Sequence, residues 1–106
     1  MVDPKVIKVV KEYLNELSAK GILITKAFIY GSQANGNAKP DSDIDLMLIS
    51  PLFDNETDKY MPVIWLSRIR TDNRIEPIAI GEKRFIDDDF TPLIEIVRQM
   101  GVEITA

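Results

Sequence analysis

The sequence contains no cysteine and no histidine among its 106 residues. The absence of cysteine excludes disulfides, thiolate nucleophiles and zinc–thiolate centres. The absence of histidine excludes imidazole as a general base, a proton carrier or a metal ligand. Any catalysis by this chain must therefore depend on carboxylates, hydroxyls, Lys and Arg side chains, and a metal ion that oxygen ligands recruit.

Long apolar runs and an excess of positive charge are also missing. No apolar stretch approaches the roughly 18–20 residues that a membrane span needs, and residues 1–5 lack the basic-then-apolar order of a secretory signal. The 17 acidic residues outnumber the 13 basic ones, which argues against broad nonspecific nucleic-acid binding. We therefore expect a cytoplasmic protein.

The composition and the hydrophobic pattern are those of one globular domain. With 45% apolar and 28% charged residues and no internal repeat or linker, residues 1–106 are expected to form a single domain. The pattern predicts helices over residues 4–20, about 58–70 and 92–100. It predicts strands over residues 22–30, 43–50, 74–80 and, briefly, 102–104, with connections at 31–42, 51–58 and 81–90. This order predicts an α/β (α+β) fold: a small mixed β-sheet of three to four strands flanked by helices.

Two further expectations concern packing. Pro77 cannot donate to a sheet ladder, which places the third long strand at an edge or a bulge. The inward faces of the last two helices are expected to contain Val63, Ile64, Leu66 and Ile69, and Leu93, Ile94, Ile96, Val97 and Met100.

Two carboxylates begin the second predicted strand. Asp43 and Asp45 are separated by one residue, so in a strand they share a face about 6.6–6.8 Å apart. Two aspartates there would repel each other without a cation. Oxygen ligands in a chain without His or Cys favour Mg²⁺ or Mn²⁺. The pair therefore predicts a divalent metal site.

The turn before these carboxylates has the composition of a phosphate site. Gly31 follows the first predicted strand, so the chain can turn sharply and bring backbone N–H groups close to an anion. Ser32 could cap a short helix while its hydroxyl and the following amides hold a phosphate. Ser42 caps or braces the turn into the strand, and Lys39 is expected to be a solvated loop residue.

Other motifs fail on spacing. Gly31 and Gly36 mimic a P-loop, but Asn37 and Ala38 stand where Lys and Ser/Thr are required. Residues 41–45 begin like a calcium-binding EF-hand loop, but Leu46 replaces its turn glycine. A phosphatase-type Asp-x-Asp normally ends an apolar strand, whereas these aspartates begin one.

The combined pattern resembles the DNA polymerase beta nucleotidyltransferase superfamily. Gly31-Ser32, ten residues, and then Asp43-x-Asp45 occur within Gly-Ser-x-Ala-x-Gly…Ser-Asp-Ile-Asp-Leu. The likeness is closest to the stand-alone minimal nucleotidyltransferases (MNT). It implies that the Gly-Ser turn and Ser42 contact a nucleoside triphosphate and that Asp43 and Asp45 bind Mg²⁺. A third carboxylate completes the family's metal site, and its counterpart here is Glu76, where the family commonly has Asp.

The resemblance also implies an activity and a partner. The expected reaction is Mg²⁺- or Mn²⁺-dependent transfer of a nucleoside monophosphate, AMP from ATP, to an acceptor hydroxyl, with Asp43, Asp45 and Glu76 catalytic. Minimal nucleotidyltransferases often pair with a small helical HEPN protein in toxin–antitoxin systems, as antitoxins that modify a toxin tyrosine or bind the toxin. A non-catalytic binding subunit is the alternative, and transfer to a small molecule such as an antibiotic is a weaker one. A homodimer stays open.

For several charged and aromatic residues the sequence leaves two roles open. Glu76 could instead be a salt-bridged strand residue. Three arginines near a predicted helix end could contact a triphosphate or an acidic partner, although such residues are more often plain surface; they are Arg68, Arg70 and Arg74. The acidic run 87–89 is expected to be solvated in front of a helix. Three residues could pack in the core or form an interface: Tyr60, Met61 and Trp65.

Overall fold

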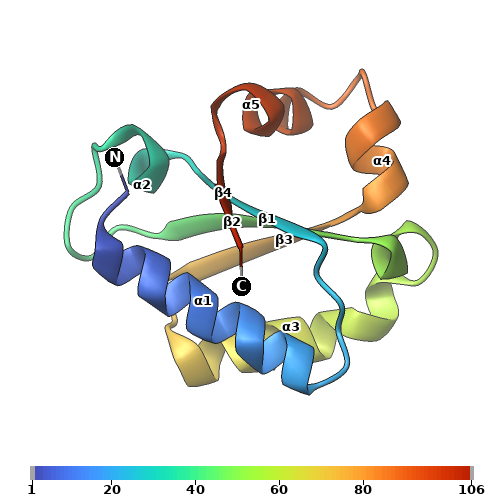
Figure 1. Ribbon diagram of the computed structural model, residues 1–106, viewed down its shortest axis with the longest axis horizontal. Helices are drawn as coiled ribbons and strands as arrows, with labels where there is room; N and C mark the ends of the chain where they lie inside the picture. The colour runs from blue at the N-terminus through green and yellow to red at the C-terminus, as the bar shows by residue number, and fades with distance from the viewer. Residues whose placement is uncertain (1, 106) are drawn as a thin grey trace.

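A computed structural model describes residues 2–105 as one mixed sheet with helices on both faces (Figure 1). The strands are β1 (Lys26–Tyr30), β2 (Ile44–Ser50), β3 (Ile75–Gly81) and β4 (Val102–Ile104), in the order β3-β2-β1-β4. β2 and β3 are parallel, whereas β1 is antiparallel to β2 and to β4. The predicted α/β fold with a small mixed sheet is confirmed, and Pro77 lies on an edge strand as expected.

The helices divide between the two faces of the sheet. They are α1 (Pro4–Ala19), α2 (Ser32–Asn35), the 3-10 turn η1 (Pro51–Asp54), α3 (Thr57–Thr71), α4 (Glu82–Asp87) and α5 (Pro92–Met100). Figure 1 shows α1 and α3 side by side on one face and α4 and α5 on the other. No helix within residues 2–105 has the length and apolar character that a membrane crossing requires.

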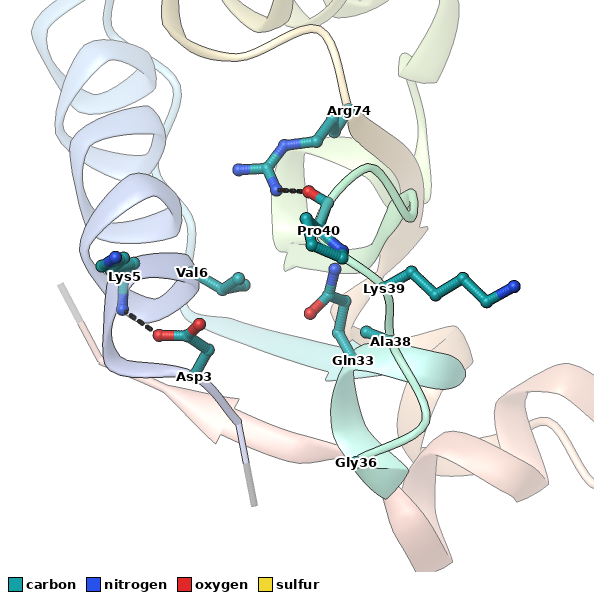
Figure 2. Close-up of a pocket in the computed structure, with 9 residues that line it drawn as sticks. All are labelled: Asp3, Lys5, Val6, Gln33, Gly36, Ala38, Lys39, Pro40 and Arg74. Atoms are coloured by element: carbon teal, nitrogen blue, oxygen red, sulfur yellow. Dashed lines mark hydrogen bonds between the residues drawn. The ribbon is translucent and has the colours of Figure 1, made fainter.

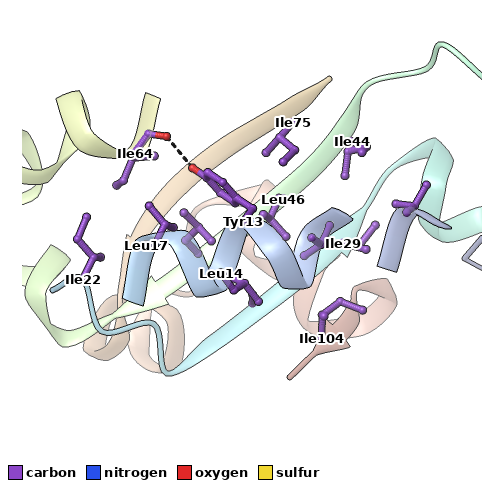
Figure 3. Packing of buried hydrophobic residues seen from close by; sticks show 14 of the residues in the cluster. Tyr13, Leu14, Leu17, Ile22, Ile29, Ile44, Leu46, Ile64, Ile75 and Ile104 are labelled. Atoms are coloured by element: carbon purple, nitrogen blue, oxygen red, sulfur yellow. Dashed lines mark hydrogen bonds between the residues drawn. The ribbon is translucent and has the colours of Figure 1, made fainter. Parts of the chain in front are cut away.

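The larger core lies between the sheet and the α1–α3 pair (Figure 3). Helical spacing in α1 directs Val10, Tyr13 and Leu17 onto this face, where they are fully buried. The Tyr13 hydroxyl donates a 2.8 Å hydrogen bond to the carbonyl of Ile64, which ties α1 to α3. Burial raises the pKa of Tyr13 far above its ordinary value. Burial thus keeps the phenol neutral, and its hydrogen bond joins the two helices.

The opposite face of the sheet has a smaller core under α4 and α5. Phe28 stacks on Phe85 of α4 with ring centroids 5.2 Å apart. Ile94 and Val97 of α5 are buried against Met47 and its neighbours. Because successive strand residues point to opposite faces, β2 contributes alternate residues to each core. This explains its nearly continuous apolar run.

Several predicted connections contain short helices. Residues 31–42 include α2, residues 51–58 include η1, and residues 81–90 include α4. The start of α4 depends on a distant residue, because the backbone N–H groups of Lys83 and Arg84 donate to the carboxylate of Asp54. A side chain at position 81 would collide with that carboxylate, so Gly81 is required for the contact. Local patterns could not reveal this long-range cap.

Two expectations about the first strand and the helix faces need correction. The first strand begins at Lys26 and not at residue 22, because the Ile22 N–H donates to Leu17 and completes the end of α1. Two residues of α3 and two of α5 that were expected inside are exposed: Leu66, Ile69, Ile96 and Met100. In α3 a polar residue, Ser67, is buried instead, and its hydroxyl accepts a hydrogen bond from the Lys20 ammonium group at the end of α1 at 2.9 Å.

The acidic run 87–89 is not uniformly solvated. Asp88 accepts hydrogen bonds from the backbone N–H groups of Phe90 and Thr91, from the Thr91 hydroxyl and from Arg84. These donors hold the pKa of Asp88 well below its usual range. Asp88 therefore organises the connection from α4 into α5.

Candidate functional site

Sheet register brings two predicted site residues and one unpredicted residue into a single row. Tyr30 on β1 pairs with Asp45 on β2, and Asp45 pairs with Glu76 on β3. Paired residues on neighbouring strands point to the same face. We call these three residues the acidic row. It lies on the α4–α5 face, one pleat beyond the apolar side chains that those helices cover.

Asp43 lies immediately before β2 and joins the row electrostatically. Burial first, and then the negative charges of Asp43 and Glu76, raise the pKa of Asp45 above its ordinary value. Burial and the charges of Asp45 and Glu76 raise the pKa of Tyr30 to about 12. The charges of Asp43 and Glu76 therefore lie close enough to Asp45 to disfavour its ionised form.

The Gly31 turn lies directly against Asp45. Gly31 has φ of 72°, in the left-handed region that favours glycine, and a Cβ there would collide with the Asp45 carboxylate. The carbonyl of Gly31 accepts the first hydrogen bonds of α2, so Gly31 and not Ser32 occupies its N-cap position. Ser32 is the first helical residue, beside the turn. Contact of either residue with a phosphate stays a prediction.

Arg68 of α3 engages Glu76. The guanidinium Nη2 lies 3.2 Å from Glu76 Oε1, and the same side chain donates to the carbonyls of Asn73 and Ile75. As placed, no three carboxylates within residues 2–105 converge as a metal-ligand group. The Glu76 carboxylate is paired with Arg68 instead.

The residues nevertheless fit a divalent cation by their chemistry. The donor set is carboxylate oxygen alone, which Mg²⁺ and Mn²⁺ accept. Burial first, and then the charges of Asp43 and Glu76, raise the pKa of Asp45, and a bound cation would oppose both effects. Glu76 combines the two interpretations of the sequence, since it is a register neighbour of Asp45 and also a salt-bridged strand residue.

Ser42 and its neighbours brace the loop that leads into β2. The Ser42 hydroxyl accepts from the Lys39 N–H at 2.8 Å, and the Ser42 carbonyl accepts from the Gln33 amide at 3.3 Å. Arg74 donates to the Pro40 carbonyl at 3.0 Å and pairs with Asp72. These contacts fix the approach to Asp43. Contact of Ser42 with a nucleotide stays a prediction.

A pocket of about 470 Å³ lies on the other side of this loop (Figure 2). Figure 2 shows Gln33, Pro40 and Arg74 facing the start of α1 across it, and none of the carboxylates of the acidic row lines it. Its wall includes Lys39, and the Arg74 guanidinium is already engaged by Asp72. The pocket and the acidic row are thus separate features.

Sequence patterns missed Tyr30 and the specific role of Arg68. Tyr30 directly precedes Gly31, so antiparallel pairing of that strand with the Asp-x-Asp strand would have placed it beside Asp45. For Arg68 no local signal existed, because it reaches Glu76 from a helix on the opposite face of the sheet.

Comparison with known proteins agrees with this fold. A family model described as "Nucleotidyltransferase domain" matches residues 7–104. A solved structure described as "a putative nucleotidyltransferase from Sulfolobus solfataricus" superposes with a TM-score of 0.65 at 18% identity, covering 93% of this chain and 78% of that one. A search of curated proteins by sequence finds no significant match.

The fold and the family model define the class of protein. This chain belongs to the nucleotidyltransferase-domain family, whose members typically use a nucleoside triphosphate and a divalent metal. Family membership indicates transferase activity, and the structural likeness independently supports the fold.

Proposed function

We propose that this chain is an active nucleotidyltransferase that moves AMP from ATP to an acceptor hydroxyl. The observation that carries the proposal is the register of Asp45 and Glu76 on adjacent parallel strands, with Asp43 two residues before Asp45 and Gly31 against Asp45. This arrangement supports Asp43, Asp45 and Glu76 as the ligands of a divalent cation. It supports the turn at Gly31 and Ser32 as the contact for the β- and γ-phosphates.

The chemistry assigned to these residues is positioning and charge neutralisation. A divalent cation held there supplies positive charge to the phosphate oxygens. The acceptor oxygen bonds to the α-phosphorus, the bond from that phosphorus to the bridging oxygen breaks, and pyrophosphate leaves. We assign the hydroxyl proton to the Glu76 carboxylate. The turn at Gly31 and Ser32 holds the leaving phosphates in line with the attack.

For the acceptor we propose a tyrosine on a small helical HEPN-type protein, with this chain as its antitoxin. Exposed large apolar side chains support a protein partner, because such surfaces mark interaction sites. On α4, α5 and their connection they are Ile86, Phe90, Ile96 and Met100. Phe90 is 93% exposed, so Phe90→Ser should weaken a complex without lowering stability by more than about 0.5 kcal/mol.

The experiment uses ATP labelled at the α-phosphate, Mg²⁺, and the product of the adjacent reading frame as acceptor. We expect label on the acceptor with the wild type and none with Asp43→Asn/Asp45→Asn. The double variant should still bind the acceptor, which separates catalysis from docking.

The alternative function is a non-catalytic antitoxin that acts by complex formation alone. The ion pair between Arg68 and Glu76 favours it, since that pair engages the third carboxylate. A stable complex without transfer under Mg²⁺ or Mn²⁺ would replace the enzyme proposal with this one.

A further inference from the structure

Arg68 is fixed independently of the carboxylate that it contacts. It lies near the end of α3 and reaches round β3, the edge strand of the sheet. Its Nη2 donates to the Asn73 carbonyl at 2.8 Å and its Nε donates to the Ile75 carbonyl. Ile75 begins this edge strand and Asn73 lies in the turn before it. Edge strands leave a row of carbonyls without a neighbouring strand, and Arg68 donates to carbonyls at this edge. These two bonds to backbone carbonyls do not involve Glu76.

Glu76 is the weakly held member of the pair. Its one contact with Arg68 is 3.2 Å long, and its side chain is 40% exposed against 18% for Arg68. Ion pairs of such exposed carboxylates are weak. Glu76 also stands beside Asp45 on the neighbouring strand, about 4.8 Å away along the hydrogen-bonding direction. Side-chain rotation alone can therefore carry its carboxylate between Arg68 and Asp45.

We propose that Arg68 is a positioning residue that holds the Glu76 carboxylate at the sheet edge when no metal is bound. When a divalent cation binds, Glu76 leaves Arg68 and joins Asp43 and Asp45 as a ligand. The inference rests on the proposed metal site. Because the cation must compete with Arg68 for Glu76, the ion pair lowers the affinity of the site for the cation.

Trp65 reports this exchange. The Arg68 guanidinium lies over its ring, 4.9 Å from the centroid, and Trp65 is the single tryptophan of the chain. Release of Glu76 leaves the guanidinium charge uncompensated beside the indole. Mg²⁺ alone should therefore shift the tryptophan emission of the wild type, and Glu76→Gln should not show this shift.

Metal affinity gives the quantitative test. Mn²⁺ binding is measured by the electron paramagnetic resonance signal of the free ion. Arg68→Gln removes the charge but keeps an amide donor for the edge carbonyls, and it should bind Mn²⁺ about 3- to 10-fold more tightly because the competing ion pair is gone. Arg68→Lys keeps a charge and should lie between. Arg70→Gln removes an equal charge from an exposed position on the same helix and should bind like the wild type.

A double-mutant cycle separates release of Glu76 from simple charge removal. In the Glu76→Gln background, Arg68→Gln should leave Mn²⁺ affinity unchanged, because no carboxylate remains to be released. Equal tightening in both backgrounds, or an unshifted tryptophan emission in a wild type that binds Mn²⁺ through Asp43 and Asp45, overturns this role of Arg68 and leaves the proposed function standing. A wild type that binds no Mn²⁺, with or without ATP, overturns both.

Discussion

Two neighbouring rows on the same face of the sheet differ completely in chemistry. Phe28, Met47 and Ile78 form an apolar row across β1, β2 and β3, and the acidic row lies one pleat away on the same strands. The apolar row belongs to the core under α4 and α5, whereas Asp45 in the acidic row has its pKa raised by burial and like charges. The apolar row stabilises the fold by burial, whereas the acidic row places like charges near Asp45 that a bound cation would neutralise.

The largest expected effect comes from the acidic row. Asp45→Asn should lower AMP transfer by at least about 100-fold, because a lost metal ligand removes several kcal/mol of charge stabilisation. The free energy of unfolding should stay the same or rise, since a disfavoured charge is removed. Transfer assays and urea unfolding on one preparation check both. A variant that retains transfer but is less stable would show that Asp45 has a structural role and not a catalytic one.

The apolar row should respond in the opposite way. Met47 is fully buried and lies two residues after Asp45, so Met47→Ala should lower the free energy of unfolding by about 2–5 kcal/mol. Urea unfolding measures this change. A loss below about 1 kcal/mol would mean that α4 and α5 do not form a core on this face.

The Gly31 turn lies at the acidic row and allows a matched comparison. Gly31→Ala should cost about 1–3 kcal/mol of stability, because φ of 72° with ψ of −148° lies in a region almost confined to glycine. It should also weaken Mn²⁺ binding, because the new Cβ displaces the Asp45 carboxylate. Gly21 has φ of 83°, and a Cβ there would meet no atom within 4 Å. Gly21→Ala should therefore lose stability through backbone strain alone, with unchanged Mn²⁺ affinity. Equal metal affinity in both variants would contradict the close approach of Gly31 to Asp45.

The smallest expected effect is a pH dependence in the metal-free protein. Because folding raises the pKa of Asp45 above its ordinary value of about 3.9, the ionised carboxylate destabilises the fold. Asp45→Asn should thus exceed the wild type in stability at neutral pH. That advantage should shrink as pH falls through the raised pKa toward the ordinary one. Unfolding free energies measured in chelator from pH 7 downward test this, and an advantage that grows on acidification would be inconsistent with it.

Local patterns predicted most of the fold, because helix ends and strand positions depend largely on residues that are close in the sequence. Asp3 and Gly21 mark the two ends of α1 as expected, and Pro77 lies at a sheet edge. The short helix α4 was missed because its start depends on Asp54, which comes from a different part of the chain. The outward positions of Leu66 and Met100 were missed because periodicity shows an apolar face but not how much of it a neighbour covers.

The candidate site could be predicted as a set of residue types but not as an arrangement. Asp43 and Asp45 followed from spacing along one strand, and Glu76 from resemblance. The neighbour relation of Asp45 and Glu76 depends on parallel pairing between strands, and the Arg68 contact depends on a side chain of α3 that reaches round the edge strand. Neither relation has a signature within a short stretch of sequence.

The central claim is that the carboxylates beside the Gly31 turn, and not the pocket of Figure 2, hold the nucleotide and its cation. A crystal structure with Mg²⁺ and a non-hydrolysable ATP analogue tests it most directly. We predict a cation between Asp43 and Asp45 with Glu76 turned away from Arg68, and the β- and γ-phosphates at the start of α2. A nucleotide bound in the pocket beside Arg74, with no cation at Asp45, would contradict it.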